Sequence, residues 1–389
     1  GTDYDWITAG GSFSTIGTRN LAALTTLPDL TTGTDNVVAG NLAGDNLTTG
    51  SNNVAIGNRA LDAATTGGRN IAIGQDAMGS GVATGDGYNV AVGFQAGNAL
   101  TSAANNFLGG LFAGWNLTTG SDNVAIGKAA LDQATTGGRN IAIGADAMGS
   151  GVATNASGHN IALGTEAGQD ITTGTHNFLA GNRAGWDVTT GTNNIAIGNG
   201  TLDAANSATH NIALGSGALS SATTGGRNIA IGQEAMNFGV ATAASGDNIA
   251  IGYQVGYGLT SGTNNFLGGQ RSGTNLTTGS NNVALGNGAL DSATTGGRNI
   301  AIGQDAMGLG VATAANGYNV SIGVEAGKSI TSGTYNTLIG WQAGDALNSS
   351  LGSVVIGAGA FSAASTSRGT AIGLSALENA TGDGNTAIG

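Results

Sequence analysis

The sequence predicts an all-β fold, a parallel β-roll or β-solenoid of about 21 short rungs. A five-residue phrase, Asn-Φ-Ala-Φ-Gly with Φ usually aliphatic, recurs along nearly the whole chain, mostly every 17 residues. Glycine occurs 73 times and proline once, and aromatic residues make up only 5%, so small residues must do the packing. The hydrophobic fraction, 40%, is too high for a disordered linker. A fixed short period is typical of a solenoid, in which each turn buries its apolar face only against its neighbours.

Each copy of the phrase predicts one short strand. In Asn53–Gly57, Val54 and Ile56 share one face of the strand and Ala55 lies on the other, because side chains alternate along a strand. We expect the aliphatic pair to point inward on every rung, as Val54, Ile56, Ile71, Ile73, Val124 and Ile126. A second short strand is expected at Arg59–Leu61, followed by a tight corner at Thr65–Gly67.

A longer period organises the rungs into groups of four. The twenty residues 65–84 recur almost unchanged at 135–154, 223–242 and 294–313. At about 4.8 Å per stacked rung, 21 rungs would form a rod on the order of 100 Å long. Residues 1–30 lack the phrase and are predicted to be an N-terminal cap or junction, and residues 31–389 to be the repetitive shaft or head.

The alanine face suggests self-association. A thin roll buries little apolar area, and the central alanine of each phrase leaves a smooth face that another chain could approach closely. The expected contact residues are Ala55, Ala72, Ala125, Ala142, Ala196 and Ala230. We therefore expect the chain to be its own partner, as a homotrimer.

Composition argues against several partners. The net charge of −12 repels phosphate backbones, so nucleic acid is not an expected partner. No run of about eighteen apolar residues is present, so membrane insertion within this segment is not expected. The absence of cysteine removes disulfides and thiolate metal sites, and no cofactor or metal is expected.

The phrase resembles a known family of repeats. Asn123–Gly127 followed by Ala130 resembles the repeat of YadA-like heads in trimeric autotransporter adhesins, and Asn385–Gly389 is similar to repeats in the shafts of bacteriophage tail fibres. The resemblance covers roughly residues 31–389. It implies a left-handed parallel β-roll, a homotrimer, and a location outside the cell, at the cell surface or in a virion tail. The rungs here, of 16 to 20 residues, are longer than those of the adhesins.

The asparagine that opens each phrase is predicted to be structural. The same amide in the same place on every turn can bond its copies on the neighbouring turns, which gives an internal ladder. The ladder residues are Asn53, Asn70, Asn123, Asn140, Asn194, Asn228, Asn282 and Asn299.

The position before that asparagine varies between charged, aromatic and histidine residues, which indicates solvent exposure. All three histidines, His159, His176 and His210, occupy it, and an exposed polar ladder is favoured there over a metal site because no carboxylate recurs beside them. Arg69, Arg139, Arg227 and Arg298 occupy it once per group of four rungs and are expected to form salt bridges.

Tryptophans on small-residue rungs are the candidate contacts for a receptor. Trp115, Trp186 and Trp341 could stack on sugars or apolar receptor groups, with packing at chain edges as the alternative. Phe107 and Phe178 are expected in the core. No catalytic residue is predicted, because Gly-x-Ser-x-Gly is absent and the segment Gly323–Ser329 is one residue short of a phosphate-binding loop.

These observations favour a non-enzymatic fibre, a structural shaft or adhesin that mediates attachment to a receptor or glycan on a cell surface. A phage tail fibre and a bacterial adhesin both remain open as its owner. The main alternative is an ice- or surface-binding solenoid, although the Thr-Thr doublets place only one threonine column outward. A polysaccharide-cleaving β-helix is a third class, and it would need recurrent acids on one local patch.

Overall fold

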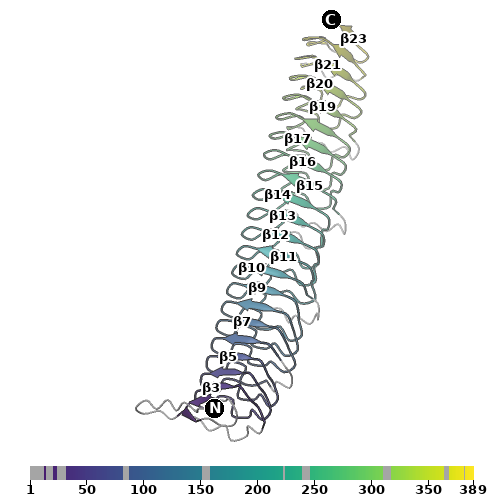
Figure 1. Ribbon diagram of the computed structural model, residues 1–389. Coiled ribbons are helices and arrows are strands. Elements are labelled where there is room, and N and C mark those ends of the chain that lie inside the picture. Colours follow the sequence, from purple (N-terminus) through teal and green to yellow (C-terminus); the bar gives the residue numbers. More distant parts are fainter. Residues whose placement is uncertain are drawn as a thin grey trace. The chain divides into compact units, whose positions relative to one another are not determined.

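The computed structural model describes residues 13–14, 21–23, 32–81, 87–150, 158–221, 224–238, 246–309, 317–362, 368–380 and 382–389. The chain divides into two compact units, residues 1–192 and 193–389. Every regular element among the described residues is a β-strand (Figure 1). The predicted N-terminal cap, residues 1–30, lies outside the described part except for β1 (Phe13–Ser14) and β2 (Leu21–Ala23), which pair antiparallel.

Each unit is a parallel β-solenoid, as the repeat predicts, and each rung carries one three-residue strand. In the first unit β2 pairs with β3, and the rungs carry β3 (Val37–Ala39), β4 (Val54–Ile56), β5 (Ile71–Ile73), β6 (Val90–Val92), β7 (Phe107–Gly109), β8 (Val124–Ile126), β9 (Ile141–Ile143), β10 (Ile161–Leu163) and β11 (Phe178–Ala180). In the second unit they are β12 (Ile195–Ile197), β13 (Ile212–Leu214), β14 (Ile229–Ile231), β15 (Ile249–Ile251), β16 (Phe266–Gly268), β17 (Val283–Leu285), β18 (Ile300–Ile302), β19 (Val320–Ile322), β20 (Thr337–Ile339), β21 (Val354–Ile356), β22 (Thr370–Ile372) and β23 (Thr386–Ile388).

The strands stack with the repeat in register. In β8 and β9, Val124 pairs with Ile141, Ala125 with Ala142 and Ile126 with Ile143. Equivalent positions therefore form straight columns within each unit, and a property that recurs in the sequence becomes a continuous feature of the surface or core.

The second strand expected at Arg59–Leu61 is wrong. Residues 58–63 form turns, and Arg59 and Leu61 both adopt left-handed backbone conformations, with φ of 54° and 55°. Two left-handed residues separated by one cannot continue an extended strand, so the chain reverses here. Ala60 and Leu61 are buried against the strand.

The predicted facing of the strands is also wrong. Ala125 has no exposed surface, whereas Ile126 is 38% exposed, and Val124 is half-buried. The same holds for Ala55 between Val54 and Ile56, and for Ala72 between Ile71 and Ile73. Asparagine and the central alanine lie two residues apart and so share a face, which means that a buried asparagine brings the alanine inward and turns the aliphatic pair outward.

The core of many rungs is filled by complementary sizes at two positions. On these rungs an alanine at the centre of the strand, such as Ala125, is followed six positions later by a large residue, such as Leu131, and both are fully buried. Where the central residue is Leu108, its partner is Gly114, and a Cβ there would lie 3.0 Å from both δ carbons of Leu108. Three further rungs have the same leucine–glycine pair, at Leu179 and Gly185, Leu267 and Gly273, and Leu338 and Gly344.

The two phenylalanines expected in the core lie on the outward side of their strands. Phe107 is 45% exposed and Phe178 is half-buried. Both occupy the first strand position, which faces away from the core on every rung. The fully buried aromatic residue is instead Phe361, in the last core cluster of the second unit.

Candidate interaction surface

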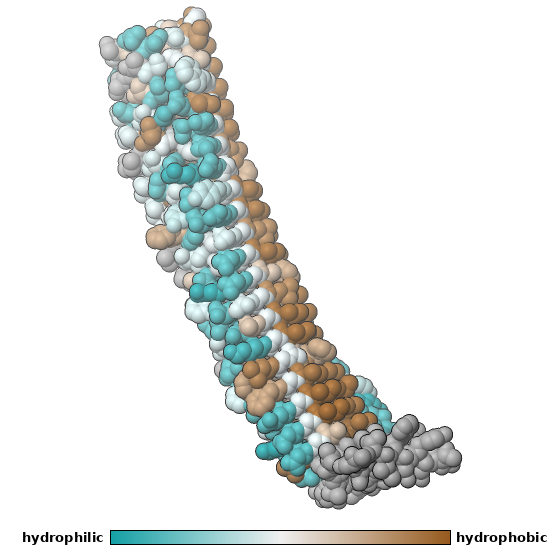
Figure 2. Space-filling model, turned by 90° about the vertical axis from the view of Figure 1, so that its left-hand side faces the viewer, coloured by the Kyte–Doolittle hydropathy of each residue, from teal (hydrophilic) through white to brown (hydrophobic). Residues whose placement is uncertain are grey.

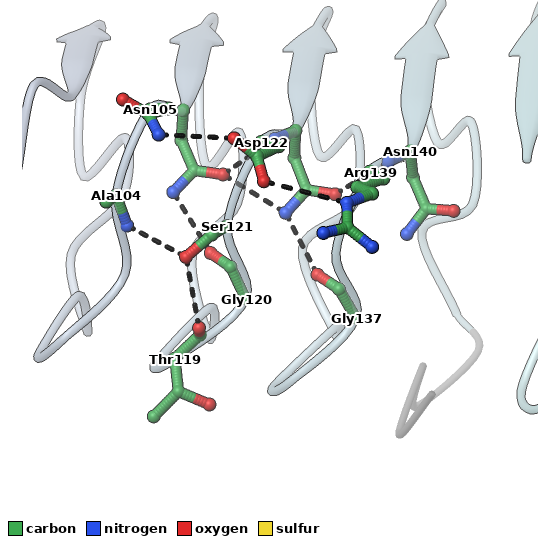
Figure 3. Close-up of polar contacts among 11 residues, drawn as sticks. Ala104, Asn105, Thr119, Gly120, Ser121, Asp122, Gly137, Arg139 and Asn140 are labelled. Carbon is green, nitrogen blue, oxygen red and sulfur yellow. Dashed lines mark hydrogen bonds and ion pairs between the residues drawn. The ribbon is translucent and has the colours of Figure 1, made fainter. Parts of the chain in front are cut away.

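The asparagines form a buried amide ladder. In the first unit, the Asn123 backbone N–H and side-chain Nδ2 both donate to Asn106 Oδ1, at 2.9 and 3.0 Å. The Asn123 Nδ2 also donates to the Gly137 carbonyl at 2.9 Å, and the Asn140 N–H donates to Asn123 Oδ1 (Figure 3). The Asn123 amide thus joins three consecutive rungs and satisfies backbone groups at the corner that would otherwise be buried without a partner.

The eight predicted ladder residues are all buried, and all make such bonds. The side chains of Asn53, Asn123, Asn194 and Asn282 donate to backbone carbonyls fourteen residues later. The backbone N–H groups of Asn70, Asn140, Asn228 and Asn299 donate to the preceding ladder amide. Because the ladder is enclosed, its chemistry serves the fold and is not presented to a ligand.

The first and third residues of each strand form what we call the outer strand face. In the first unit its exposed members are Val37, Ile56, Ile71, Ile73, Val92, Phe107, Ile126 and Ile143. In the second unit they include Ile195, Ile197, Ile251, Phe266, Ile300, Ile322, Ile339, Val354, Ile356 and Ile388. No strand from β3 to β23 carries a charged residue at these two positions, where threonine is the only polar side chain.

The outer strand face is visible as a band of hydrophobic side chains beside bands of polar ones (Figure 2). Scattered apolar residues are normal on a protein surface, but a contiguous apolar patch is typical of an interaction site. Hydrophobicity alone does not reveal this face, because it predicts that the aliphatic pair lies in the core. The signal that identifies the inward side is the pairing of a central leucine with a glycine six residues later, seen at Leu108 and Gly114.

The residue before each ladder asparagine belongs to a second column, which we call the flanking column. Its side chains contact one another from rung to rung. Tyr318 and Tyr335 stack with ring centroids 5.0 Å apart, and His159 and His176 do the same at 5.0 Å. All these residues have left-handed backbone conformations and are exposed, as the variability of the position predicts.

Ion pairs are also made along the flanking column. Arg227 donates to Asp247 with its Nε at 2.6 Å, and this pair lowers the pKa of the Asp247 carboxyl. Arg139 lies 3.8 Å from Asp122 (Figure 3). In the part of the chain that the structure describes, no three histidine or carboxylate side chains come together as metal ligands.

The three tryptophans lie in different surroundings. Trp186 is half-buried, with the Arg183 guanidinium 4.4 Å from its ring and its Nε1 donating to Gln169. Trp115 packs against Phe112, with ring centroids 5.9 Å apart. Trp341 is 54% exposed and makes no ring contact of this kind with any residue that the structure describes, so it is the most accessible of the three.

Several carboxylates in the turns that follow the strands are partly buried. Burial raises the pKa of Asp132 above its usual range, and a nearby Asp146 raises it further. Burial likewise raises the pKa of Asp170, with a contribution from Asp187. The Asp132 Oδ1 atom is buried without a hydrogen-bond partner. These groups weaken the fold at neutral pH, because the charged form is poorly solvated.

Comparison of the chain with models of known protein families gives no match, and comparison with curated proteins gives none. Within the described ranges, no helix has the length and hydrophobicity needed to cross a membrane.

Proposed function

We propose that this chain is a non-enzymatic fibre segment, a structural shaft or adhesin that assembles with copies of itself and mediates attachment outside the cell, at a cell surface or in a virion tail. The observation that carries this proposal is the outer strand face, which repeats an uncharged, apolar surface on every rung. A monomer that kept this face in water would be prone to associate.

The central alanines of the strands, which the sequence predicts as the contact between chains, cannot provide that contact. Ala55, Ala72, Ala125, Ala142, Ala196 and Ala230 are all fully buried inside their own chain. The proposed homotrimer therefore rests on the outer strand face, and the number three rests on the resemblance to trimeric adhesin heads.

The free energy gained by burying each side chain of the outer strand face favours a partner with the same repeat. Complete burial of a valine or isoleucine is worth about 1.5 to 3 kcal/mol, so a side chain that is already some 60% buried gains about 1 kcal/mol more. Association itself costs about 4 to 15 kcal/mol. Several consecutive rungs must be covered before the complex is stable, and only a surface with the same rung spacing can match this face over many rungs. A second copy of this chain has that spacing.

Mass measurement tests the assembly. The full chain should sediment as a multiple of 37.5 kDa, and native mass spectrometry should give the number of copies. The double variant Val92→Glu and Ile126→Glu, on alternate rungs of the outer strand face, should shift the assembly to monomer because each carboxylate would lose its water on association. Val92 and Ile126 are exposed within one chain, so the variant should keep its β-sheet circular dichroism.

The matched control places the same two charges on the flanking column, as Asn52→Glu and Asn105→Glu. It should remain assembled. A wild-type chain that is monomeric at micromolar concentration, or a face variant that assembles as well as the control, would refute self-association through this surface.

A surface-binding threonine array is less well supported. The Thr118 hydroxyl donates to the Thr135 carbonyl at 2.9 Å, and the Ser121 hydroxyl accepts the Ala104 N–H at 3.0 Å. Within this doublet Thr119 is exposed and Thr118 is half-buried. A single column offers a narrower array than the outer strand face.

A further inference from the structure

The flanking column of the second unit contains a continuous stack of flat side chains. The Arg298 guanidinium lies 5.4 Å from the Tyr318 ring centroid, and the Tyr318 and Tyr335 rings are 5.0 Å apart and within 6° of parallel. The stack therefore advances by about one ring per rung, as the spacing of parallel strands requires.

The next rung interrupts this stack at Gly352. Consecutive backbone bonds fix the order of the column: the N–H groups of Tyr335, Gly352 and Arg368 donate to carbonyls of the rungs before them, at 2.9, 3.0 and 2.8 Å. Gly352 has φ of 68°, and no atom of the described residues lies within 4 Å of the place where its Cβ would be. From Asp35 to Tyr335, every position of the flanking column is occupied by a residue with a side chain.

The interruption leaves a slot one rung deep. One wall is the outer face of Tyr335, which is 60% exposed. The other is Arg368, two rungs along the column, whose exposed guanidinium has no hydrogen-bond or ion-pair partner among the described residues. Two rung spacings separate these walls by roughly 10 Å, so a group placed midway would lie about 5 Å from each.

These walls indicate what kind of ligand fits the slot. Its depth admits one ring, as the 5.0 Å stacking of Tyr318 on Tyr335 shows, and the apolar C–H face of a pyranose ring can pack on the exposed face of Tyr335 in the same way. A guanidinium without a partner binds a carboxylate through two parallel hydrogen bonds. We infer that the slot between Tyr335 and Arg368, opened by Gly352, is a binding site for an acidic pyranose, a sugar ring that carries a carboxylate.

The inference deepens the proposed attachment role and rests on it, because it names the class of glycan and the residues that would hold it. Binding is measured on the full chain with immobilised oligosaccharides that contain glucuronate or sialic acid, beside neutral oligosaccharides of the same length. Wild type should bind at least one acidic probe at least tenfold more tightly than its neutral counterpart.

The decisive variant fills the slot. Gly352→Tyr should continue the stack, because Tyr318 and Tyr335 already adopt φ of 48° and 60° in the same column. It should fold and assemble like wild type while acidic glycan binding falls at least about tenfold. Tyr335→Ala and Arg368→Gln should each weaken binding, and only Arg368→Gln should remove the preference for acidic over neutral probes.

Tyr88→Ala provides the matched control, since Tyr88 is an exposed tyrosine of the same column that is followed by Asn105 instead of glycine. It should bind normally. Failure of every acidic probe to bind, or binding that survives Gly352→Tyr, would overturn the site. Native mass spectrometry of the same samples reports assembly separately, so that a failed slot and a failed fibre are distinguishable.

Discussion

Because a large residue faces a small one across the core, at Leu108 and Gly114 on one rung and in the reverse order at Ala125 and Leu131 on the next, exchanging the two sizes should preserve much of the stability that either single substitution loses. Leu108→Ala removes a fully buried side chain and should destabilise the region by about 3 kcal/mol. Gly114→Leu alone forces a Cβ to within 3.0 Å of two Leu108 carbons and should cost about 2 kcal/mol. If the effects were additive, the double variant would lose about 5 kcal/mol.

The double variant should instead lose only about 1 to 2 kcal/mol, because it converts this rung to the arrangement of the next, where Ala125 and Leu131 fill the core together. The left-handed conformation of Gly114, with φ of 59°, does not prevent the exchange, since Leu131 has φ of 55° at the same position. Some loss remains because Leu108 also fills space beside Gly97, at 2.8 Å from a Cβ built there.

Hydrogen exchange of the amides in β6, β7 and β8 is the assay, because a rung can open locally without unfolding the whole stack. A loss of about 3 kcal/mol speeds exchange more than 100-fold. Both single variants should show fast exchange and the double variant near wild-type protection. Equal or greater loss in the double variant would refute the complementary packing.

Two further predictions concern polar groups. Asn123→Ala should destabilise its unit by about 2 to 4 kcal/mol in thermal unfolding, because Gly137 and Asn140 lose buried hydrogen-bond partners. Asn105→Ala, in the exposed flanking column one rung earlier, should change the stability little. Equal effects of the two variants would contradict the ladder. Asp132→Asn should raise the unfolding temperature at pH 7. Because the folded-state pKa of Asp132 is raised, its carboxylate weakens the fold above that pKa, and the advantage of Asn should vanish as pH falls below the usual aspartate range; a pH-independent difference would contradict this cause.

The repeat in the sequence was sufficient to predict parallel, in-register strands. A phrase of fixed length that recurs at a nearly fixed spacing can bury its apolar side only by stacking, whichever side that is. The internal position of the asparagines also follows from the sequence, because an identical amide on every turn can bond its neighbours. Together these two predictions already implied the correct facing, since Asn53 and Ala55 lie two residues apart on one strand.

Hydrophobicity and the alternation of side chains give opposite predictions for the facing of each strand, and the structure follows the alternation. Val54 and Ile56 are more apolar than Ala55, and in a globular core the larger apolar residues would lie inside. In this solenoid the interior is too narrow for a β-branched pair on every strand. It accommodates one large side chain from the far side of the rung, such as Leu61 or Met78, opposite a small one.

The amino-acid sequence is therefore enough to establish a one-dimensional order: the rung length, the position of the strand in each Asn-Φ-Ala-Φ-Gly phrase, the parallel register and the buried amides. Which face is covered and which is left for a partner depends on the folded rung, because the left-handed turn at residues such as Arg59 and Leu61 carries its second half back across the strand. The same geometry places Gly352 between Tyr335 and Arg368, residues separated by 33 positions in the sequence and by two rungs in the column.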